Sequence, residues 1–142
     1  MEEVTDMNQV VSAAGTACMY LALCGVALAQ PRLPYNPTDQ EALLLPVECQ
    51  AIRKGGPTAQ AYSNRLQSQG IIGISHYCAG LNFVNRSKLA LNSVEKRFDL
   101  QSAIDEFDYV LGHSAPNAVG LQKIRAMKEE AEMLLKLLPG SR

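Results

Sequence analysis

A cysteine and a histidine near the middle of this sequence are the residues best suited to chemistry. His76 and Cys78 lie two positions apart. A Cys/His pair can act as nucleophile and base when the two side chains are within hydrogen-bond reach and a third group orients the histidine. On a helix, residues two positions apart point in different directions. We therefore expect a structural cysteine beside a capping or surface histidine, and no catalytic residue.

The same side chains, together with His113, raise the question of a metal site. Zinc and haem sites are recognised by spacings such as C-x-x-C, H-x-x-x-H and C-x-x-C-H, and the sequence has none of them. Three acidic residues, Asp105, Glu106 and Asp108, fall on the polar side of a predicted helix, where a solvated face is the usual arrangement. We predict no metal site, no cofactor and no enzymatic activity.

The N-terminal part of the sequence predicts export. Residues 10–29 carry no charge and end in Ala27-Leu28-Ala29, and small residues at the first and third positions before a cleavage site suit a signal peptidase. A segment of this length also suffices to cross a bilayer. We interpret residues 1–29 as a signal peptide and place the protein in the periplasm or outside the cell. The alternative is that residues 10–29 are retained as a membrane anchor. Residues 30–142 are predicted to form a single domain.

Removal of residues 1–29 leaves two cysteines, Cys49 and Cys78. In an exported chain, such an even pair is most simply a disulfide. Closing a loop of about thirty residues would stabilise the fold by about 3–4 kcal/mol. The alternative is two unpaired buried thiols.

Apolar residues recur at helical spacing through most of the remaining sequence, and no segment shows the alternation of a strand. Prolines, glycines and capping residues divide this pattern into segments. The predicted elements are a short helix after Thr38 that breaks at Pro46, followed by helices over about 59–69, 75–91, 99–111 and 118–138, with Asp99 as a cap after a polar connection at 92–97. The sequence therefore predicts an all-α fold.

One glycine lies in the middle of a predicted helix. Gly80 falls within the 75–91 segment, and glycine in a helix interior costs about 1 kcal/mol relative to alanine. The close approach of another helix, which a side chain would block, explains such a residue. We expect the helices over 75–91 and 99–111 to pack together at Gly80.

This predicted helix pair resembles the tetratricopeptide repeat. Ala103, Phe107 and Val110 match the spacing of the small and aromatic residues on the second helix of the repeat, and Tyr77 and Gly80-Leu81 are similar to the first helix. The connection between the two helices is longer than in the 34-residue repeat. The resemblance is therefore to one degenerate repeat.

The sequence is also similar to a group of small exported bacterial proteins with tetratricopeptide-like helices. Leu45-Pro46-Val47-Glu48-Cys49 and His76-Tyr77-Cys78-Ala79-Gly80-Leu81 carry this similarity. It implies antiparallel helix pairs, a closing C-terminal amphipathic helix, and a partner-binding groove lined by the first helix of the pair. By register, the residues that would face this groove are Tyr77, Leu81, Val84, Asn85 and Lys88. For Leu81 and Val84 the alternative is a place in the core.

Tyrosine and asparagine with one cation suit an extended peptide or a partner helix. We therefore expect a non-enzymatic protein-binding or assembly module of the cell envelope or exterior, whose partner is another protein or further copies in an oligomer, filament or membrane complex. A net charge of −1 offers no basic surface for nucleic acid, and a membrane is expected as partner only if residues 10–29 are retained. The alternative function is a soluble carrier or sensor of a small ligand held between helices.

Overall fold

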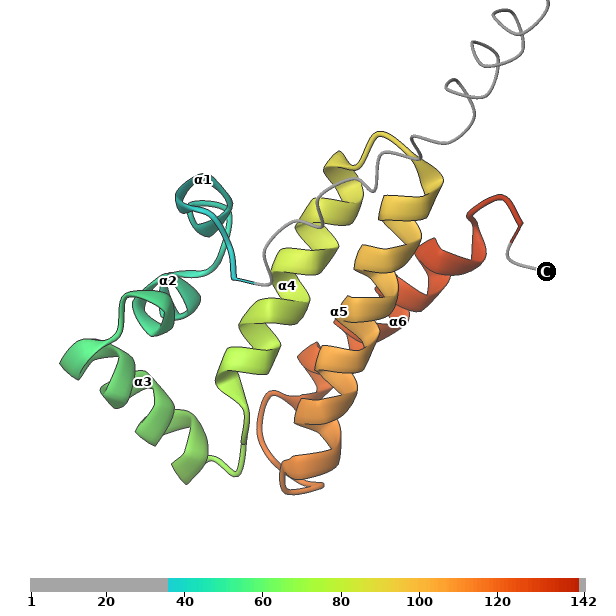
Figure 1. The fold of residues 1–142 in the computed structure, drawn as a ribbon. Helices are drawn as coiled ribbons and strands as arrows, with labels where there is room; N and C mark the ends of the chain where they lie inside the picture. The colour runs from blue at the N-terminus through green and yellow to red at the C-terminus, as the bar shows by residue number, and fades with distance from the viewer. Residues whose placement is uncertain (1–35, 141–142) are drawn as a thin grey trace, which may run out of the picture. The chain divides into compact units, whose positions relative to one another are not determined.

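The computed structural model describes residues 36–140, which are helical apart from their turns and contain no strand. The prediction of an all-α fold is confirmed. The expected signal peptide or anchor at residues 1–29 lies outside the described residues. The helices are α1 (Asp39–Ala42), α2 (Val47–Lys54), α3 (Gly56–Ser68), α4 (Ile74–Leu89), α5 (Ser93–His113) and α6 (Leu121–Lys136) (Figure 1).

The three longer C-terminal helices build the core. The predicted apolar stripe of α5 is buried, and α5 packs against both α4 and α6 because this stripe is broad enough to face two neighbours. The short helices α1 to α3 lie beside α4, on the left of Figure 1. The buried residues of α5 and α6 that form the centre are Leu100, Ala103, Ile104, Phe107, Val110, Leu121, Ile124 and Ala131.

The prediction of where α5 begins was wrong. The sequence pattern indicated a polar connection at 92–97 and a cap at Asp99, but α5 starts at Ser93. Asn92 provides the cap, because its side-chain Oδ1 accepts a hydrogen bond of 2.9 Å from the backbone N–H of Glu95. Asp99 lies inside the helix and is buried. Asparagine and aspartate are both favoured N-cap residues, and the helix uses Asn92, seven positions before Asp99.

The short first helix with a break is observed as expected: α1 ends at Ala42, and the break before α2 contains Pro46. Pro46 is the N-cap of α2, a place where its missing N–H costs nothing. The remaining bounds differ less: α3 starts at Gly56, α5 continues through Gly112 to His113, and α6 is shorter at each end than the predicted 118–138.

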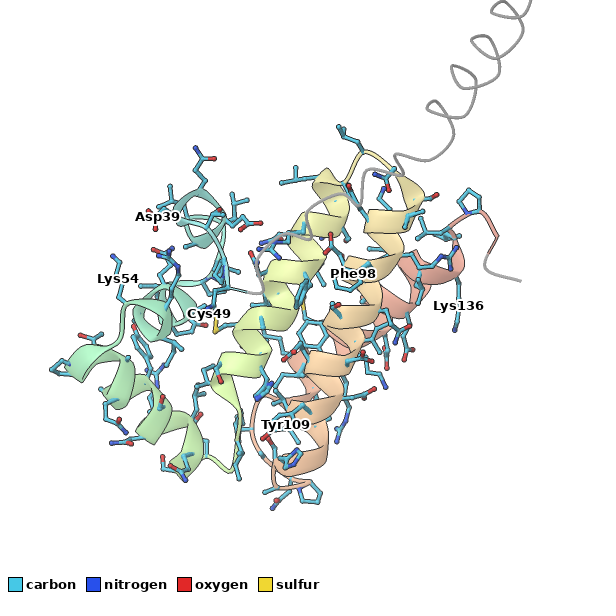
Figure 2. The ribbon with its side chains drawn as sticks, viewed as in Figure 1. Asp39, Cys49, Lys54, Phe98, Tyr109 and Lys136 are labelled. Atoms are coloured by element: carbon cyan, nitrogen blue, oxygen red, sulfur yellow. A yellow bond between two sulfur atoms is a disulfide. The ribbon has the colours of Figure 1, made fainter. Side chains whose placement is uncertain are left out.

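A disulfide joins α2 to α4. The Sγ atoms of Cys49 and Cys78 are 2.01 Å apart, and the two Cα atoms are separated by 5.4 Å. Both residues are buried, and Cys49 is marked in Figure 2. This confirms the predicted pairing. Within residues 36–140, no helix is both long and apolar enough to cross a membrane.

Candidate functional site

The predicted partner-binding residues are all on α4, and three of the four reach its accessible side. The side chain of Leu81 is partly buried against the core, Asn85 is half-buried and Lys88 is exposed. Tyr77 is in the core instead, only 6% exposed, with its ring centroid 6.4 Å from that of Phe107. Tyr77 therefore does not present its ring to a partner. Val84, the fifth residue of the expected groove, is buried.

Helix α6 continues this surface. Lys88 Nζ lies 3.0 Å from Glu130 Oε1, and this ion pair links the last turn of α4 to the middle of α6. One turn to either side of Glu130, Met127 and Leu134 are partly buried against the core. We call this surface the α4–α6 face. It consists of Leu81, Asn85, Lys88, Met127, Glu130 and Leu134. Half-exposed apolar side chains with polar groups beside them are the usual composition of a protein-binding surface.

A second cluster crosses from α4 to α5 and was not expected from the sequence. His76 Nδ1 and Glu106 Oε2 are 2.7 Å apart, a separation at which Nδ1–H donates to the carboxylate. The His76 ring stacks on Tyr109 at 3.7 Å between centroids, and Tyr109 stacks on His113 at 4.0 Å. His113 Nδ1–H donates to the carbonyl oxygen of Tyr109 over 2.7 Å. Three rings are thereby held in one fixed stack.

Glu106 departs from the solvated face expected of it. Its side chain is only 13% exposed, and burial raises the pKa of its carboxyl above the ordinary value. Asp105 and Asp108 are exposed as predicted. Helical register assigned Glu106 to the polar side of α5. It could not show that α4 packs against α5 at this position.

A buried ion pair fixes α1 against α4. Arg86 is 4% exposed, and its guanidinium donates to both carboxylate oxygens of Glu41 at 2.5 and 3.1 Å. The hydrogen bonds from Arg86 hold the pKa of Glu41 at about 2, against an ordinary 4.5. Nearby, burial raises the pKa of Asp99 to about 6, and the positive charge of Arg86 opposes this shift.

Asn82 and Ser87 are also buried polar residues of this part of α4. Asn82 is the one whose side chain lacks a partner among the described residues. It is fully buried, and neither its amide nitrogen nor its oxygen has a hydrogen-bond partner among the residues that the structure describes. Such an amide costs about 1–3 kcal/mol. No sequence signal marks it, because an asparagine on a helix is more often exposed.

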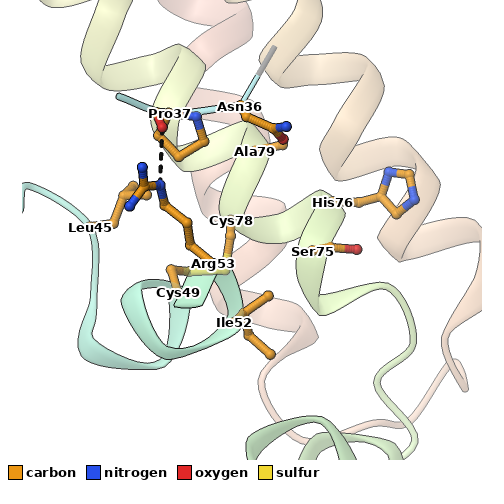
Figure 3. A pocket seen from close by; sticks show the side chains of 10 residues that line it. All are labelled: Asn36, Pro37, Leu45, Cys49, Ile52, Arg53, Ser75, His76, Cys78 and Ala79. Carbon is orange, nitrogen blue, oxygen red and sulfur yellow. Dashed lines mark hydrogen bonds between the residues drawn. A yellow bond between two sulfur atoms is a disulfide. The ribbon is translucent and has the colours of Figure 1, made fainter. Parts of the chain in front are cut away.

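A cleft of about 570 Å³ opens between the start of the described chain, α2 and α4 (Figure 3). The buried disulfide lies in its wall with Arg53 and Ser75. Arg53 already donates to the carbonyl oxygen of Pro37 at 3.1 Å and pairs with Asp39 at 2.7 Å. The cleft has the volume of a small-molecule pocket, but its cation is committed to neighbours in the protein.

Within residues 36–140, no three His, Cys, Asp or Glu side chains come together in a way that could hold a metal ion.

Comparison with known proteins adds no relative. No protein-family model matches this chain, and neither a curated protein nor a solved structure matches it significantly.

Proposed function

We propose that this protein is a non-enzymatic protein-binding or assembly module of the cell envelope or exterior, and that the α4–α6 face is its binding surface. The observation that carries the proposal is the Lys88–Glu130 ion pair at 3.0 Å. It joins α4 to α6 on the accessible side where the half-buried Leu81, Met127 and Leu134 lie next to polar groups. The tetratricopeptide resemblance assigns the same side of the first helix to partner binding.

The proposed partner is an extended segment or a helix of another protein, or a second copy of this chain. A side chain inserted between α4 and α6 would bury the exposed parts of Leu81 and Leu134, while Asn85 would offer an amide for its backbone. The disulfide supports the proposed location, since such bonds persist in oxidising compartments.

Photo-crosslinking from single positions tests this proposal. A photoreactive amino acid replaces Asn85 in the full chain, and the matched control replaces Gln101, an exposed residue of α5. We expect a discrete adduct with a second polypeptide from position 85 and none from position 101. The adduct should weaken in Lys88→Glu, which places two acids side by side. Equal adducts from both positions, or none from 85, would contradict the proposal.

The alternative is a carrier or sensor of a small ligand, and the cleft beside the disulfide is the feature that favours it. Ser75 would offer a hydroxyl to an anionic metabolite, and Arg53 would offer its guanidinium by exchanging Asp39 for the ligand. A thermal-shift screen with small carboxylates and phosphates separates the two functions, because a carrier gains stability from its ligand. The Arg53→Gln variant should abolish that gain if the cleft is the site.

A further inference from the structure

The turn between α4 and α5 carries a cluster of large exposed apolar side chains. Leu89, Leu91, Val94 and Phe98 are 67%, 99%, 77% and 46% exposed. They come from the end of α4, the connection and the first turns of α5, so they lie together at one end of the helix pair, at the top of Figure 1. We call residues 89–98 the hairpin tip. Single exposed leucines are ordinary, but a cluster of this kind marks a contact surface.

Cations flank these apolar side chains. The hairpin tip contains Lys96 and Arg97 against a single acidic residue, Glu95. Arg97 also donates to the carbonyl oxygen of Pro139 at 2.9 Å. Apolar side chains that project from a turn, with basic residues around them, are suited to the headgroup region of an anionic bilayer. The apolar groups enter the boundary of the acyl chains and the cations pair with lipid phosphates.

The uncharged segment at residues 10–29 also favours a bilayer as the partner of the hairpin tip. Asn36, where the described chain begins, accepts a hydrogen bond of 3.4 Å from Arg86 on α4 through its carbonyl oxygen. Five residues of chain separate Arg86 from Leu91, a distance of about 12 Å. The six residues 30–35 can extend about 20 Å back to the uncharged segment 10–29. A bilayer that retains residues 10–29 is therefore within reach of the hairpin tip.

We propose that the hairpin tip rests on the surface of an anionic lipid bilayer, with Leu91 and Val94 inserted at the headgroup level. This goes beyond the proposed function, because it uses other residues and another class of partner. A second copy of the chain fits the tip less well. A symmetric contact would bring Lys96 and Arg97 of one copy close to the same cations of the other.

Tryptophan fluorescence tests this proposal in the full chain, which has no tryptophan of its own. Leu91→Trp places the probe at the tip. The matched control is Val119→Trp, at a residue that is 76% exposed in the turn at the opposite end of α5, about 30 Å away along the helix. Each variant is mixed with vesicles of phosphatidylcholine alone, or of equimolar phosphatidylglycerol and phosphatidylcholine, with and without brominated acyl chains.

We expect a blue shift and bromine quenching for Leu91→Trp with the anionic vesicles, and neither for Val119→Trp. Adding Lys96→Gln should weaken the partition of Leu91→Trp by about fivefold, because one cation near an anionic surface contributes about 1 kcal/mol. Local quenching separates contact by the tip from anchoring by residues 10–29. Quenching at neither position, or equally at both, would overturn the proposal. A blue shift of Leu91→Trp that follows protein concentration without vesicles would overturn it in favour of a second copy.

Discussion

Gly80 of α4 lies directly against the ring of Phe107 of α5. A Cβ atom at position 80 would be 2.6 Å from Phe107 Cε1 and 2.9 Å from its Cδ1. The ring has little room to move, because Phe107 is fully buried in the core. The glycine that the sequence singled out in mid-helix therefore marks the point where the two central helices meet.

Gly80→Ala should destabilise the protein although alanine is the better helix former. Overpacking against a buried ring costs about 1–3 kcal/mol, more than the gain in helix propensity of about 1 kcal/mol. Denaturant unfolding of the full chain measures the difference. Gly112→Ala is the control, since this glycine of α5 has no atom near its missing Cβ, and it should be slightly more stable than the parent. An equal increase in the free energy of unfolding for both variants would show that Phe107 does not constrain position 80.

Reduction of the Cys49–Cys78 disulfide should lower the free energy of unfolding by about 3–4 kcal/mol, because the unfolded chain regains the loop entropy that the bond removes. Denaturant unfolding with and without a reductant measures this loss. The double variant Cys49→Ala, Cys78→Ala should have the reduced stability and no response to reductant. Hydrogen exchange should show faster opening of α2 and α3 first, while α5 keeps its protection. A parent protein that is indifferent to reductant would contradict this prediction.

Loss of the Glu41–Arg86 ion pair should lower the free energy of unfolding at neutral pH and leave it unchanged in acid. Because the folded-state pKa of Glu41 is about 2, below its ordinary 4.5, the stabilisation is complete above pH 4.5 and is lost as the pH falls toward 2. Glu41→Gln should cost about 2–3 kcal/mol at pH 7, since it leaves a buried guanidinium without its counter-charge. Asp39→Asn, at an exposed partner of Arg53, should change little. A cost for Glu41→Gln that is the same at pH 2 and pH 7 would contradict the assignment.

Asp99 should affect the pH dependence of stability in the opposite direction to Glu41. Burial raises its pKa from 3.8 to about 6, so the folded protein binds the proton more tightly than the unfolded chain does. Stability contributed by this group is therefore highest below pH 4 and falls as the pH rises through 6. Asp99→Asn should be more stable than the parent by about 1–2 kcal/mol at pH 7 and equal to it at pH 3. Thermal unfolding at the two pH values measures this. A variant that is less stable at pH 7 would show that Arg86 needs the Asp99 carboxylate.

The sequence predicted those features that depend on local spacing or on cysteine count. The α5 stripe, the Gly80 contact and the disulfide are of this kind. Gly80 and the two cysteines mark long-range contacts by their residue type, whereas long-range contacts without such a marker were missed. Glu106 becomes buried because His76 lies over it, and Tyr109 stacks between two histidines that are far apart in sequence. Tyr77 was expected on the surface, and its helical register did not reveal that Phe107 would cover it.

Native mass spectrometry of the untagged protein, released from its own cells under non-reducing conditions, tests the central claim most directly. If the α4–α6 face binds a protein, the measured mass will exceed that of one disulfide-bonded chain. In the Lys88→Glu variant it will return to the single-chain mass. A parent protein with the mass of one chain at every concentration would contradict the account.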